Sequence, residues 1–578
     1  MKRWVVAAKR ADFNQIAETY HITPMLARIL RNRDVTGDEA ITRFLFGTIK
    51  DLYSPKLLKD MDKAVEILTK AVSEDKKLRI VGDYDIDGVC ASYILLTGLK
   101  NCGANVSVRL PDRVHDGYGV NEAIISEAKA QGVEVLLTCD NGIAAGEQIA
   151  FAKKCGMTVI VTDHHEVPYE ETDGKKQYML PPADAVIDPK QEGCAYPYQE
   201  ICGAVVAYQL VAALYEAFEI SEEELKELLA FAAFATVGDV MPLLDENRII
   251  VKGGIAQMKV TKNLGLRALI DVTKTERSKL SPYHIGFILG PCINATGRLD
   301  TAERALQLFR SESEAEAVTI ANELKQLNDS RKDMTQFYTQ TAIQLVTEEQ
   351  AEACKEDKVL VVFLPDCHES LAGIVAGRVK EQFYKPTFVL TRSEEGIKGS
   401  GRSIEAYSMY EEMSKCKDLF TKFGGHRMAA GLSMQEKDIE EFRRRLNEQA
   451  VLTDEDMTEK VTIDIPMPIS YVTKEFIKEL ETLAPFGVGN PRPLFAQKDL
   501  KIRSLKVIGK NRNVVKMKLE APAWENKPGA VMDAVCFGEG DKIQEELSLK
   551  ETISIVYYPE LNQYMGHETL QLVIQDYR

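Results

Sequence analysis

Short hydrophobic runs alternate with longer stretches of helical periodicity between residues 78 and 188, which is typical of a parallel sheet with crossover helices. Acidic or histidine residues follow each predicted strand directly, in the segments "LRIVGDYDIDG" (78–88), "VEVLLTCDNG" (133–142), "MTVIVTDHHE" (157–166) and "ADAVIDP" (183–189). Ligands of an open parallel sheet bind beyond the carboxyl ends of its strands. The pattern therefore predicts that these polar residues gather in one crevice.

A second pattern, rich in helix formers and without glycine or proline, covers residues 315–353. One helix of this length would span about 60 Å, enough to join two domains and leave a cleft between them. The alternative is two ordinary helices broken near Asn328, Asp329 and Ser330, whose side chains compete for backbone hydrogen bonds. In either case a second α/β unit follows, and it begins with the predicted strand "KVLVVFLP" (358–365).

Alternating hydrophobic and polar residues return after Thr453, in short segments separated by polar turns. Such segments suit a small β-barrel, and an OB-fold of this size binds single-stranded nucleic acid. The segment "LKVIGKNRNVVKMK" (505–518) is locally basic, which favours contacts with backbone phosphates. The alternative is a barrel with a structural role only.

The predicted fold class is thus α/β, with two α/β domains joined by a long helix around a cleft and followed by an OB-like β-barrel. A chain of 578 residues is too long for one hydrophobic core, which agrees with several domains. The expected limits are 1–60 for a helical N-terminal region, 61–265 for the parallel-sheet domain, 266–353 for a helical connector, 354–452 for the second α/β domain and 453–578 for the barrel.

Composition indicates the compartment and argues against some classes of protein. The formal net charge of −16 argues mildly against a protein that coats nucleic acid, although a local basic groove is compatible with it. The eleven cysteines are scattered and never spaced as CxxC, so neither a disulfide framework nor a zinc ribbon is indicated. The N-terminal segment lacks the apolar core of a signal peptide, and no apolar run is long enough to cross a bilayer. We therefore expect a cytoplasmic protein.

Carboxylates at the predicted strand ends would crowd one another, because neighbouring like charges raise each other's pKa. Bound cations would relieve this crowding, and carboxylate oxygens with imidazole suit manganese, magnesium or zinc, with room for two ions that share an aspartate. The alternative, that each Asp-Gly or Asn-Gly is merely a turn, is weakened by their joint position at strand ends. The candidates are Asp83, Asp85, Asp87, Asp140, Asp163, His164 and His165, with Asp188 as a further one and with Asp239 unless it is only a helix-terminal turn.

Five motifs in this order resemble the DHH phosphoesterases, namely "DYDIDG" (83–88), "CDNG" (139–142), "TDHHE" (162–166), "GDVMPL" (238–243) and, for their DHHA1 domain, "FGGHRMAAG" (423–431). Three further stretches are similar to the RecJ branch, the single-strand-specific 5′ to 3′ DNA exonucleases: "PDRVHDGYGVN" (111–121), "NATGR" (294–298) and "PFGVGNPRPLF" (485–495). The resemblance covers the chain from about residue 60 to its end.

This resemblance implies a phosphodiesterase that uses two metal ions, manganese or magnesium, to release 5′-mononucleotides from single-stranded DNA in recombination and repair. The implied partners are single-stranded DNA, a single-strand-binding protein and a helicase, and the implied enzyme is a monomer. In the family the first histidine of the pair binds metal and the second acts at the scissile phosphate, which implies these roles for His164 and His165, with Asp163 orienting a ring nitrogen. The implied metal ligands are Asp83, Asp85, Asp87, Asp140, His164 and Asp239, and which aspartate bridges the ions stays open.

Glycine-rich turns in the second α/β unit favour phosphate binding, since glycine lets backbone N–H groups approach closely. Arginine beside them would bind phosphate oxygens through two N–H groups at once. Around His368 the sequence "HESLAGIVAGR" has glutamate and serine where the RecJ pattern commonly has proline. The substrate-binding residues implied by the resemblance are Arg298, His368, Ser400, Arg402, Gly424, Gly425 and His426.

Other functions stay open at this point. A DHH phosphodiesterase acting on short RNA or cyclic dinucleotides, or a pyrophosphatase, would share the metal motifs, but such relatives are shorter and lack the barrel. A binding scaffold without metals would not need the full set of acidic and histidine residues. A covalent mechanism through Cys139 would need a paired base, so we interpret Cys139 as a buried strand-end residue.

Overall fold

The structure is a computed structural model that describes residues 2–578 except 114–115, 118, 173–174, 350–356, 394–395, 524–528 and 565. The chain forms two compact units. The larger consists of Trp4–Gly290 with Val461–Arg578, and the smaller of Met1–Arg3 with Pro291–Lys460.

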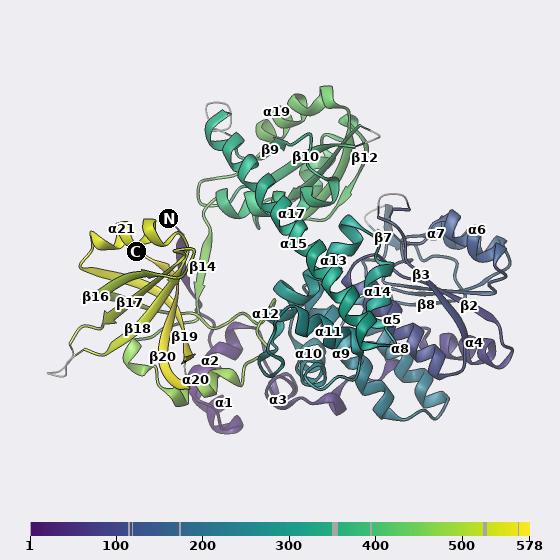
Figure 1. The fold of residues 1–578 in the computed structure, drawn as a ribbon, viewed down its shortest axis with the longest axis horizontal. Coiled ribbons are helices and arrows are strands. Elements are labelled where there is room, and N and C mark those ends of the chain that lie inside the picture. The colour runs from purple at the N-terminus through teal and green to yellow at the C-terminus, as the bar shows by residue number, and fades with distance from the viewer. Residues whose placement is uncertain are drawn as a thin grey trace. The chain divides into compact units, whose positions relative to one another are not determined.

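The larger unit contains a parallel sheet, and Figure 1 labels its strands β2, β3 and β8. The strand order is β3-β2-β4-β5-β8. The strands are β2 (Lys77–Val81), β3 (Asn105–Arg109), β4 (Val135–Cys139), β5 (Thr158–Thr162) and β8 (Ala185–Ile187). The strand order reverses between β2 and β4, which makes this the switch point at which such sheets bind ligands. The predicted parallel sheet is confirmed.

Helices cover both faces of this sheet, which explains why its central strands β4 and β5 are largely hydrophobic and buried. On one face, α6 and α7 pack against Leu136 and its neighbours. On the opposite face, Ser92 of α5 contacts Cys139, whose side chain points away from that of Leu136. The helices are α5 (Ile86–Asn101), α6 (Glu122–Ala130), α7 (Gly146–Lys154), α8 (Gly203–Ala217) and α9 (Glu222–Gly238).

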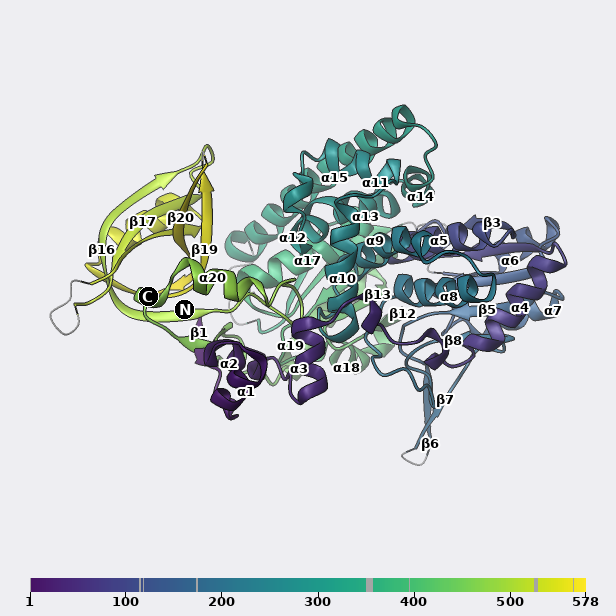
Figure 2. The same ribbon diagram turned by 90° about the horizontal axis from the view of Figure 1, so that it is seen from below.

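The other regular elements described in this domain are helices and a hairpin. The hairpin of β6 (Tyr169–Thr172) and β7 (Lys175–Tyr178) projects from the domain (Figure 2). In the stretch 111–121, which resembles the RecJ branch, Val114, His115 and Tyr118 lie outside the described residues. The remaining elements are α4 (Met61–Ser73), α10 (Asp245–Met258), α11 (Leu264–Val272), α12 (Pro282–His284) and a π-helical turn over Ile285–Leu289.

Residues from 461 onward fold as the predicted OB-like barrel. Its strands are β15 (Ile465–Pro466), β16 (Phe495–Ile508), β17 (Val514–Glu520), β18 (Val531–Phe537), β19 (Thr552–Tyr564) and β20 (His567–Tyr577), accompanied by α20 (Lys474–Glu481) and α21 (Gly540–Ser548). The order is β15-β16-β17-β18-β20-β19, and β16 also pairs with β19, which closes the sheet on itself (Figure 2). Inward-facing residues such as Leu500, Met517 and Ile555 fill the interior.

The N-terminal helices share one hydrophobic core with the barrel. Ile29 and Phe44 belong to the same buried cluster as Phe495 and Tyr557. The sequence predicted only that this region is helical. In the structure its hydrophobic side chains pack against those of the barrel. The helices are α1 (Phe13–Tyr20), α2 (Pro24–Asn32) and α3 (Asp38–Phe46).

The smaller unit contains the predicted long helix, α15 (Glu314–Gln344), which continues into a π-helical turn over Leu345–Glu349 (Figure 1). The helix runs unbroken through residues 328–330, so the alternative of two helices is wrong for the described residues. Asn328 is buried at this point, and its Nδ2 atom lies 3.5 Å from Sγ of Cys292. Its side chain therefore packs inside the unit and does not interrupt the helix. Residues 350–353 of the predicted helix lie outside the described residues.

A mixed sheet in the order β12-β13-β11-β10-β9 forms the second α/β domain. Only β9 and β10 are parallel, and the other pairs are antiparallel. The strands are β9 (Leu360–Phe363), β10 (Thr387–Ser393), β11 (Gly396–Arg402), β12 (Phe420–Gly425) and β13 (Ala429–Met434), and the helices of the unit include α13 (Gly290–Leu299), α14 (Glu303–Phe309), α17 (Glu369–Phe383), α18 (Met409–Ser414) and α19 (Ile439–Gln449).

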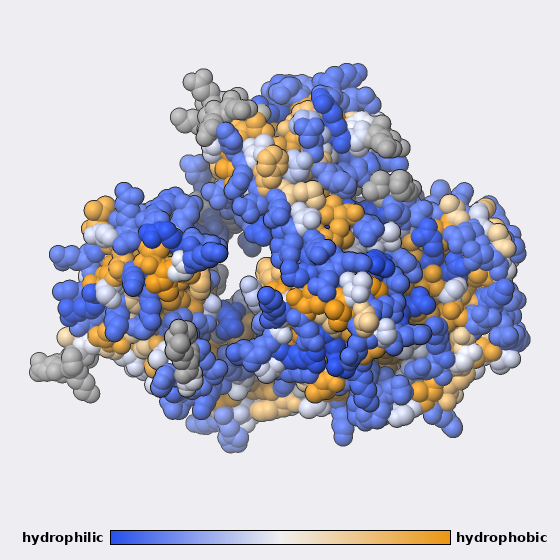
Figure 3. Space-filling view, in the orientation of Figure 1, coloured by the Kyte–Doolittle hydropathy of each residue, from blue (hydrophilic) through white to orange (hydrophobic). Residues whose placement is uncertain are grey.

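The face of the molecule drawn in Figure 3 is mainly polar. In Figure 3 hydrophilic side chains cover most of the visible face, with smaller hydrophobic areas between them. No helix within the described residues combines the length and hydropathy needed to cross a membrane.

Candidate active site

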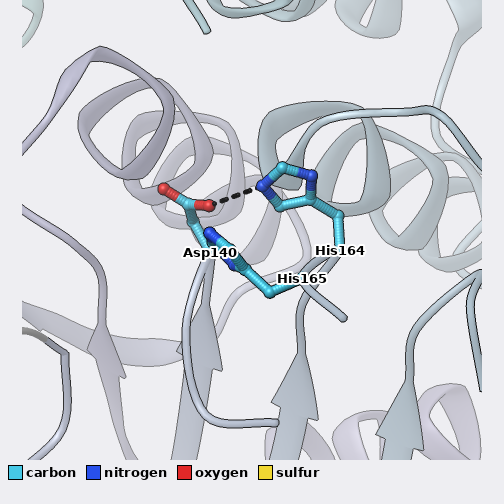
Figure 4. A group of neighbouring side chains, drawn as sticks. All are labelled: Asp140, His164 and His165. Carbon is cyan, nitrogen blue, oxygen red and sulfur yellow. Dashed lines mark ion pairs between the residues drawn. The ribbon is translucent and has the colours of Figure 1, made fainter. Parts of the chain in front are cut away.

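Predicted residues meet at the carboxyl ends of the strands, beside the switch point of the sheet. Nε2 of His164 lies 3.1 Å from Oδ1 of Asp140, 3.5 Å from Oδ2 of Asp87 and 3.9 Å from Oδ2 of Asp239. Figure 4 shows Asp140 and the two histidines at the ends of neighbouring strands, with Asp140 and His164 paired. Asp239 reaches this place as the C-cap of α9, so it is both a helix terminus and a member of the cluster.

Asp83 and Asp85 extend the cluster on the other side of Asp140. Each of the three offers a carboxylate oxygen within 4.8 Å of the others. Asp85 caps α5, and its Oδ1 accepts hydrogen bonds from the N–H groups of Asp87 at 2.9 Å and Gly88 at 3.1 Å. Oδ1 of Asp83 is buried and has no hydrogen-bond partner among the described residues. A cation would complete this arrangement, because hard divalent ions bind several carboxylate oxygens at once.

Asp87 is held by the start of α8, a contact that sequence reasoning missed. Its Oδ2 accepts a hydrogen bond from the N–H of Gly203 at 2.6 Å, and its Oδ1 accepts one from Ala204 at 2.8 Å. Helix N-termini favour carboxylates, because their N–H groups are unpaired and the helix dipole is positive there. A Cβ on Gly203 would lie 2.7 Å from Cβ of Asp140, so the helix approaches this closely only with glycine. The glycine that opens the apolar stretch "GAVVAY" (203–208) was the available signal.

Asp163 orients His165. Its Oδ1 lies 2.7 Å from Nδ1 of His165, and its Oδ2 accepts a hydrogen bond from the N–H of Ile143 at 2.9 Å. A carboxylate only accepts hydrogen bonds, so Nδ1 of His165 is the donor. Burial raises the pKa of Asp163, but the hydrogen bond and charge of His165 outweigh it and lower the pKa overall. Burial lowers the pKa of His165, but Asp163 outweighs this effect and raises it to about 9.

His164 has the properties of a metal ligand. His164 is only 7% exposed, and this burial is the main cause that lowers its pKa. A lowered pKa favours the neutral imidazole, which is the form that binds metals. Nδ1 of His164 has no hydrogen-bond partner within the part of the chain that the structure describes. Its Nε2 faces three carboxylates, which places this atom where a cation would be shared with them.

Like charges crowd the cluster, as the sequence indicated. Burial raises the pKa values of Asp83, Asp85 and Asp140, and neighbouring carboxylates raise them further. The same two causes raise the pKa of Asp239 to about 8. Carboxylate oxygens with an imidazole nitrogen suit manganese or magnesium. The donor set therefore fits divalent cations, which would neutralise the carboxylates without protonating them.

Backbone strain occurs at two points of the cluster. Asp140 has φ 59°, and Val240, which follows Asp239, has φ 61°. This left-handed region is uncommon for residues other than glycine, and a β-branched residue there is an outlier. Such strain persists where the surrounding structure over-determines the backbone, and it is frequent at active sites.

Three further residues lie at the strand ends. Asn141 is buried and joins two strands, because its Nδ2 donates to the carbonyl oxygen of Val81 at 3.0 Å; sequence reasoning assigned it no role. Asp188 is buried after β8, where burial and then Asp163 raise its pKa to about 8. Cys139 is buried as interpreted from the sequence, and burial raises its pKa to about 12, which leaves it protonated rather than nucleophilic.

In the smaller unit the glycine-rich motifs lie side by side. Ser400 of β11 pairs with Gly431 of β13, which pairs in turn with Gly424 of β12. Gly425 has φ 151°, and a Cβ there would lie 2.5 Å from the carbonyl oxygen of Ala429, so this position requires glycine. His426 follows in an exposed turn. This strand register brings the predicted Ser400, Gly424 and Gly425 together.

The other predicted substrate-binding residues surround the start of α17. His368 caps this helix, with its Nδ1 2.7 Å from Oγ of Ser370, and Arg298 donates from Nη1 to the carbonyl oxygen of Ser370 at 2.7 Å. Ser370, one of the two residues that depart from the RecJ pattern, thus contacts both. A Cβ on Gly373 would lie 2.7 Å from Nη2 of Arg402, so Gly373, which sequence reasoning missed, makes room for this guanidinium.

Comparison with known proteins gives the family. Three family models match the chain: the DHH family N-terminal domain over residues 77–236, the DHHA1 domain over 356–451 and the RecJ OB domain over 463–576. The single-stranded-DNA-specific exonuclease RecJ of Bacillus subtilis is 35% identical over 99% of this chain and 70% of its own length. The RecJ of Salmonella typhimurium is 31% identical over 98% of both chains. The chain belongs to the RecJ family.

Solved RecJ structures agree with the fold and with the kind of metal. The crystal structure of RecJ from Thermus thermophilus in complex with Mn²⁺ matches all of this chain and 79% of that one, with a TM-score of 0.83 at 26% identity. The corresponding complex with Mg²⁺ gives a TM-score of 0.76 at 25% identity. The predicted fold class is therefore confirmed. Both ions are of the class that the donor set around His164 suits.

Proposed function

We propose that this RecJ-family protein is a metal-dependent exonuclease that degrades single-stranded DNA in the 5′ to 3′ direction and releases 5′-mononucleotides, in DNA recombination and repair. The observation that carries the proposal is the group of carboxylates around Nε2 of His164 at the switch point of the sheet. Curated relatives that match nearly the whole chain are single-stranded-DNA-specific exonucleases. The metals are manganese or magnesium, with two ions bound.

Bound metal ions supply Lewis-acid chemistry, which makes a water nucleophilic at neutral pH and neutralises charge on the phosphoryl oxygens. Asp163 holds the ring of His165 through the 2.7 Å contact with Nδ1, and His165 acts at the scissile phosphate as a proton donor or electrostatic stabiliser. Cys139 takes no part, because it is buried and protonated. The residues that hold the ions are Asp83, Asp85, Asp87, Asp140, His164 and Asp239.

Substrate phosphates bind to the glycine-rich strands and to the start of α17. Backbone N–H groups of the glycines and the guanidinium groups donate to the phosphate oxygens. The barrel binds the strand farther from its 5′ end, through phosphate contacts and base stacking. The residues of the phosphate site are Arg298, His368, Ser400, Arg402, Gly424, Gly425 and His426.

The cellular setting is part of the same proposal. The protein acts in the cytoplasm as a monomer, beside a single-strand-binding protein and a helicase. A reducing compartment is supported by the ten described cysteines, all of which are free thiols. Light scattering of the purified protein tests the monomer, and co-purification with single-strand-binding protein tests the partner.

The experiment that tests the activity uses a single strand labelled at either end. With Mn²⁺ present, the 5′ label is expected to leave first as a mononucleotide, while the 3′ label stays on the shortening strand. Chelation of the metal should stop release of the 5′ label and shortening of the strand. Early release of the 3′ label would contradict the polarity, and preference for a short RNA or a cyclic dinucleotide would indicate the other substrate class.

A further inference from the structure

The motif "PFGVGNPRPLF" (485–495) has no role in the chemistry described above, yet it packs on the segment that follows Asp239. Leu243 donates a 2.7 Å backbone hydrogen bond to the carbonyl oxygen of Val488. Leu243 is buried, four residues beyond Asp239 along the chain. The motif is therefore in direct contact with the loop that carries one of the proposed metal ligands.

Both glycines of the motif lie close against this segment. A Cβ on Gly487 would lie 2.7 Å from Cδ1 of Leu243. Gly489 has φ 73°, and a Cβ there would lie 3.2 Å from Cβ of Pro242 and from Cδ1 of Leu244. A side chain at either position would therefore have to displace Pro242–Leu244 or the motif, and at Gly489 it would also strain the backbone.

The motif itself is rigidly held. Asn490 is fully buried, and its Nδ2 donates to the carbonyl oxygens of Leu483 at 2.7 Å and Pro485 at 2.8 Å. Oδ1 of Asn490 accepts a hydrogen bond from Nε of Arg33 at 2.8 Å, which ties the motif to the N-terminal helices. A buried side chain with three such bonds fixes the loop in one conformation.

The Asp239 segment is also held from the side of α10. Nδ2 of Asn247 donates to the carbonyl oxygen of Pro242 at 3.0 Å. The buried Arg248 donates from Nη1 to the carbonyl oxygen of Leu483 at 2.7 Å, which joins α10 to the residues just before the motif. Val240 lies between Asp239 and Met241 in the chain, and its left-handed φ of 61° persists only if the neighbouring residues hold the backbone. The supports act together on a short and strained segment.

We propose that the loop Phe486–Asn490 is a positioning element that holds Asp239 in the metal cluster. Asp239 comes from a helix C-terminus, whereas Asp140 and His164 follow strands of the sheet. Displacing the loop would remove one support of Pro242 and Leu243 and loosen the hold on Asp239. The inference rests on the proposed function, because it requires Asp239 to bind metal. It also means that deleting the barrel together with this loop would weaken metal binding as well as strand binding.

The test uses Gly487→Ala and Gly489→Ala in the full chain, with two matched controls. Gly146→Ala adds a Cβ in open space, and Gly103→Ala does so at a comparable φ of 83° with nothing within 4 Å. Mn²⁺ binding is measured by electron paramagnetic resonance well below the melting temperature. We expect the loop variants to bind Mn²⁺ roughly 10-fold to 100-fold more weakly than wild type, the range found for residues that support metal ligands. The controls should bind as wild type does, and excess Mn²⁺ should restore the rate of the loop variants.

Asn490→Asp is a second variant in case the alanine variants fail to fold. It keeps the shape of the side chain and its contact with Arg33, but it removes the two N–H donors to Leu483 and Pro485. The inference is overturned if folded loop variants bind Mn²⁺ as wild type does while Asp239→Ala binds it weakly. If Asp239→Ala itself binds Mn²⁺ as tightly as wild type, the assignment of Asp239 as a ligand fails instead.

Discussion

Asp163 holds the ring of His165 and not that of His164, although the two histidines are adjacent. Oδ1 of Asp163 lies 2.7 Å from Nδ1 of His165. Nδ1 of His164 has no hydrogen-bond partner among the described residues, and its Nε2 faces the carboxylates. The arrangement supports the proposed division of roles, with His164 at the metal and His165 at the phosphate.

The first prediction separates these tasks. His165→Ala should lower kcat roughly 10²-fold to 10⁴-fold while Mn²⁺ binding is retained, because it removes a group that acts in the reaction. His164→Ala should lower kcat and also weaken Mn²⁺ binding, because it removes a proposed metal ligand. Single-turnover rates and Mn²⁺ titration measure the two effects. A His165→Ala protein that loses Mn²⁺ as completely as His164→Ala would contradict the division.

The second prediction concerns like-charge crowding at Asp140, whose pKa burial and neighbouring carboxylates raise. Asp140→Asn should melt at a higher temperature than wild type in EDTA, because it removes one of the crowded carboxylates, and asparagine tolerates the left-handed backbone. With Mn²⁺ the order should reverse, since a ligand at 100 times its Kd stabilises wild type by about 2.7 kcal/mol. Melting curves with and without Mn²⁺ test this, and Asp62→Asn on the exposed face of α4 is the control. An unchanged order would argue against Asp140 as a ligand.

The third prediction is a pH dependence at Glu246 of α10, seven residues after Asp239 in the chain. Glu246 is fully buried and accepts hydrogen bonds from the Tyr196 hydroxyl at 2.5 Å and the Tyr53 N–H at 2.9 Å. Burial is the main cause that raises its pKa from 4.5 to about 7. The folded state therefore binds more protons than the unfolded state between these values, and stability falls as pH rises through this window.

Glu246→Gln should remove this part of the pH dependence, because glutamine does not titrate. Between pH 5 and pH 8 wild type should lose roughly 2–3 kcal/mol more stability than the variant. Denaturant unfolding in EDTA at both pH values measures the difference. Parallel pH profiles for the two proteins would show that Glu246 titrates in the folded protein as it does when unfolded.

The fourth prediction tests the basic strands of the barrel. In the stretch 505–518, Lys516 pairs with Asp533, whereas Lys506, Lys510 and Lys518 are exposed and have no ion pair among the described residues. Replacing these three lysines by alanine should weaken binding of a long single strand and reduce the slope of log K against log salt by about 2, at roughly 0.7 per phosphate contact. Cleavage of a short oligonucleotide should change little.

The matched control removes three exposed lysines from the parallel-sheet domain, Lys100, Lys129 and Lys259, which changes the net charge equally. Strand binding by this control should keep the wild-type salt slope. Equal slopes for the barrel variant and wild type would reduce the barrel to a structural role.

Sequence alone determined the main elements of the site. The aspartates and histidines follow hydrophobic runs, and the carboxyl ends of parallel strands share one edge, so Asp140 and His164 had to lie close together. The long helix was equally readable, because helix formers without glycine or proline favour one local conformation whatever surrounds them. Cys139 as a buried strand-end residue followed from the same hydrophobic run.

Only the tertiary structure decided how these residues are supported. The start of α8 binds Asp87, Asn328 is buried rather than a helix break, and the N-terminal helices pack into the barrel's core. The loop around Gly487 contacts Leu243 although the two are distant in the chain. The hydrophobic pattern of a segment shows which of its faces is buried, but not which remote segment covers it. Those partners are set by long-range packing, and they include the carboxylates that Nε2 of His164 faces and the loop that we propose holds Asp239.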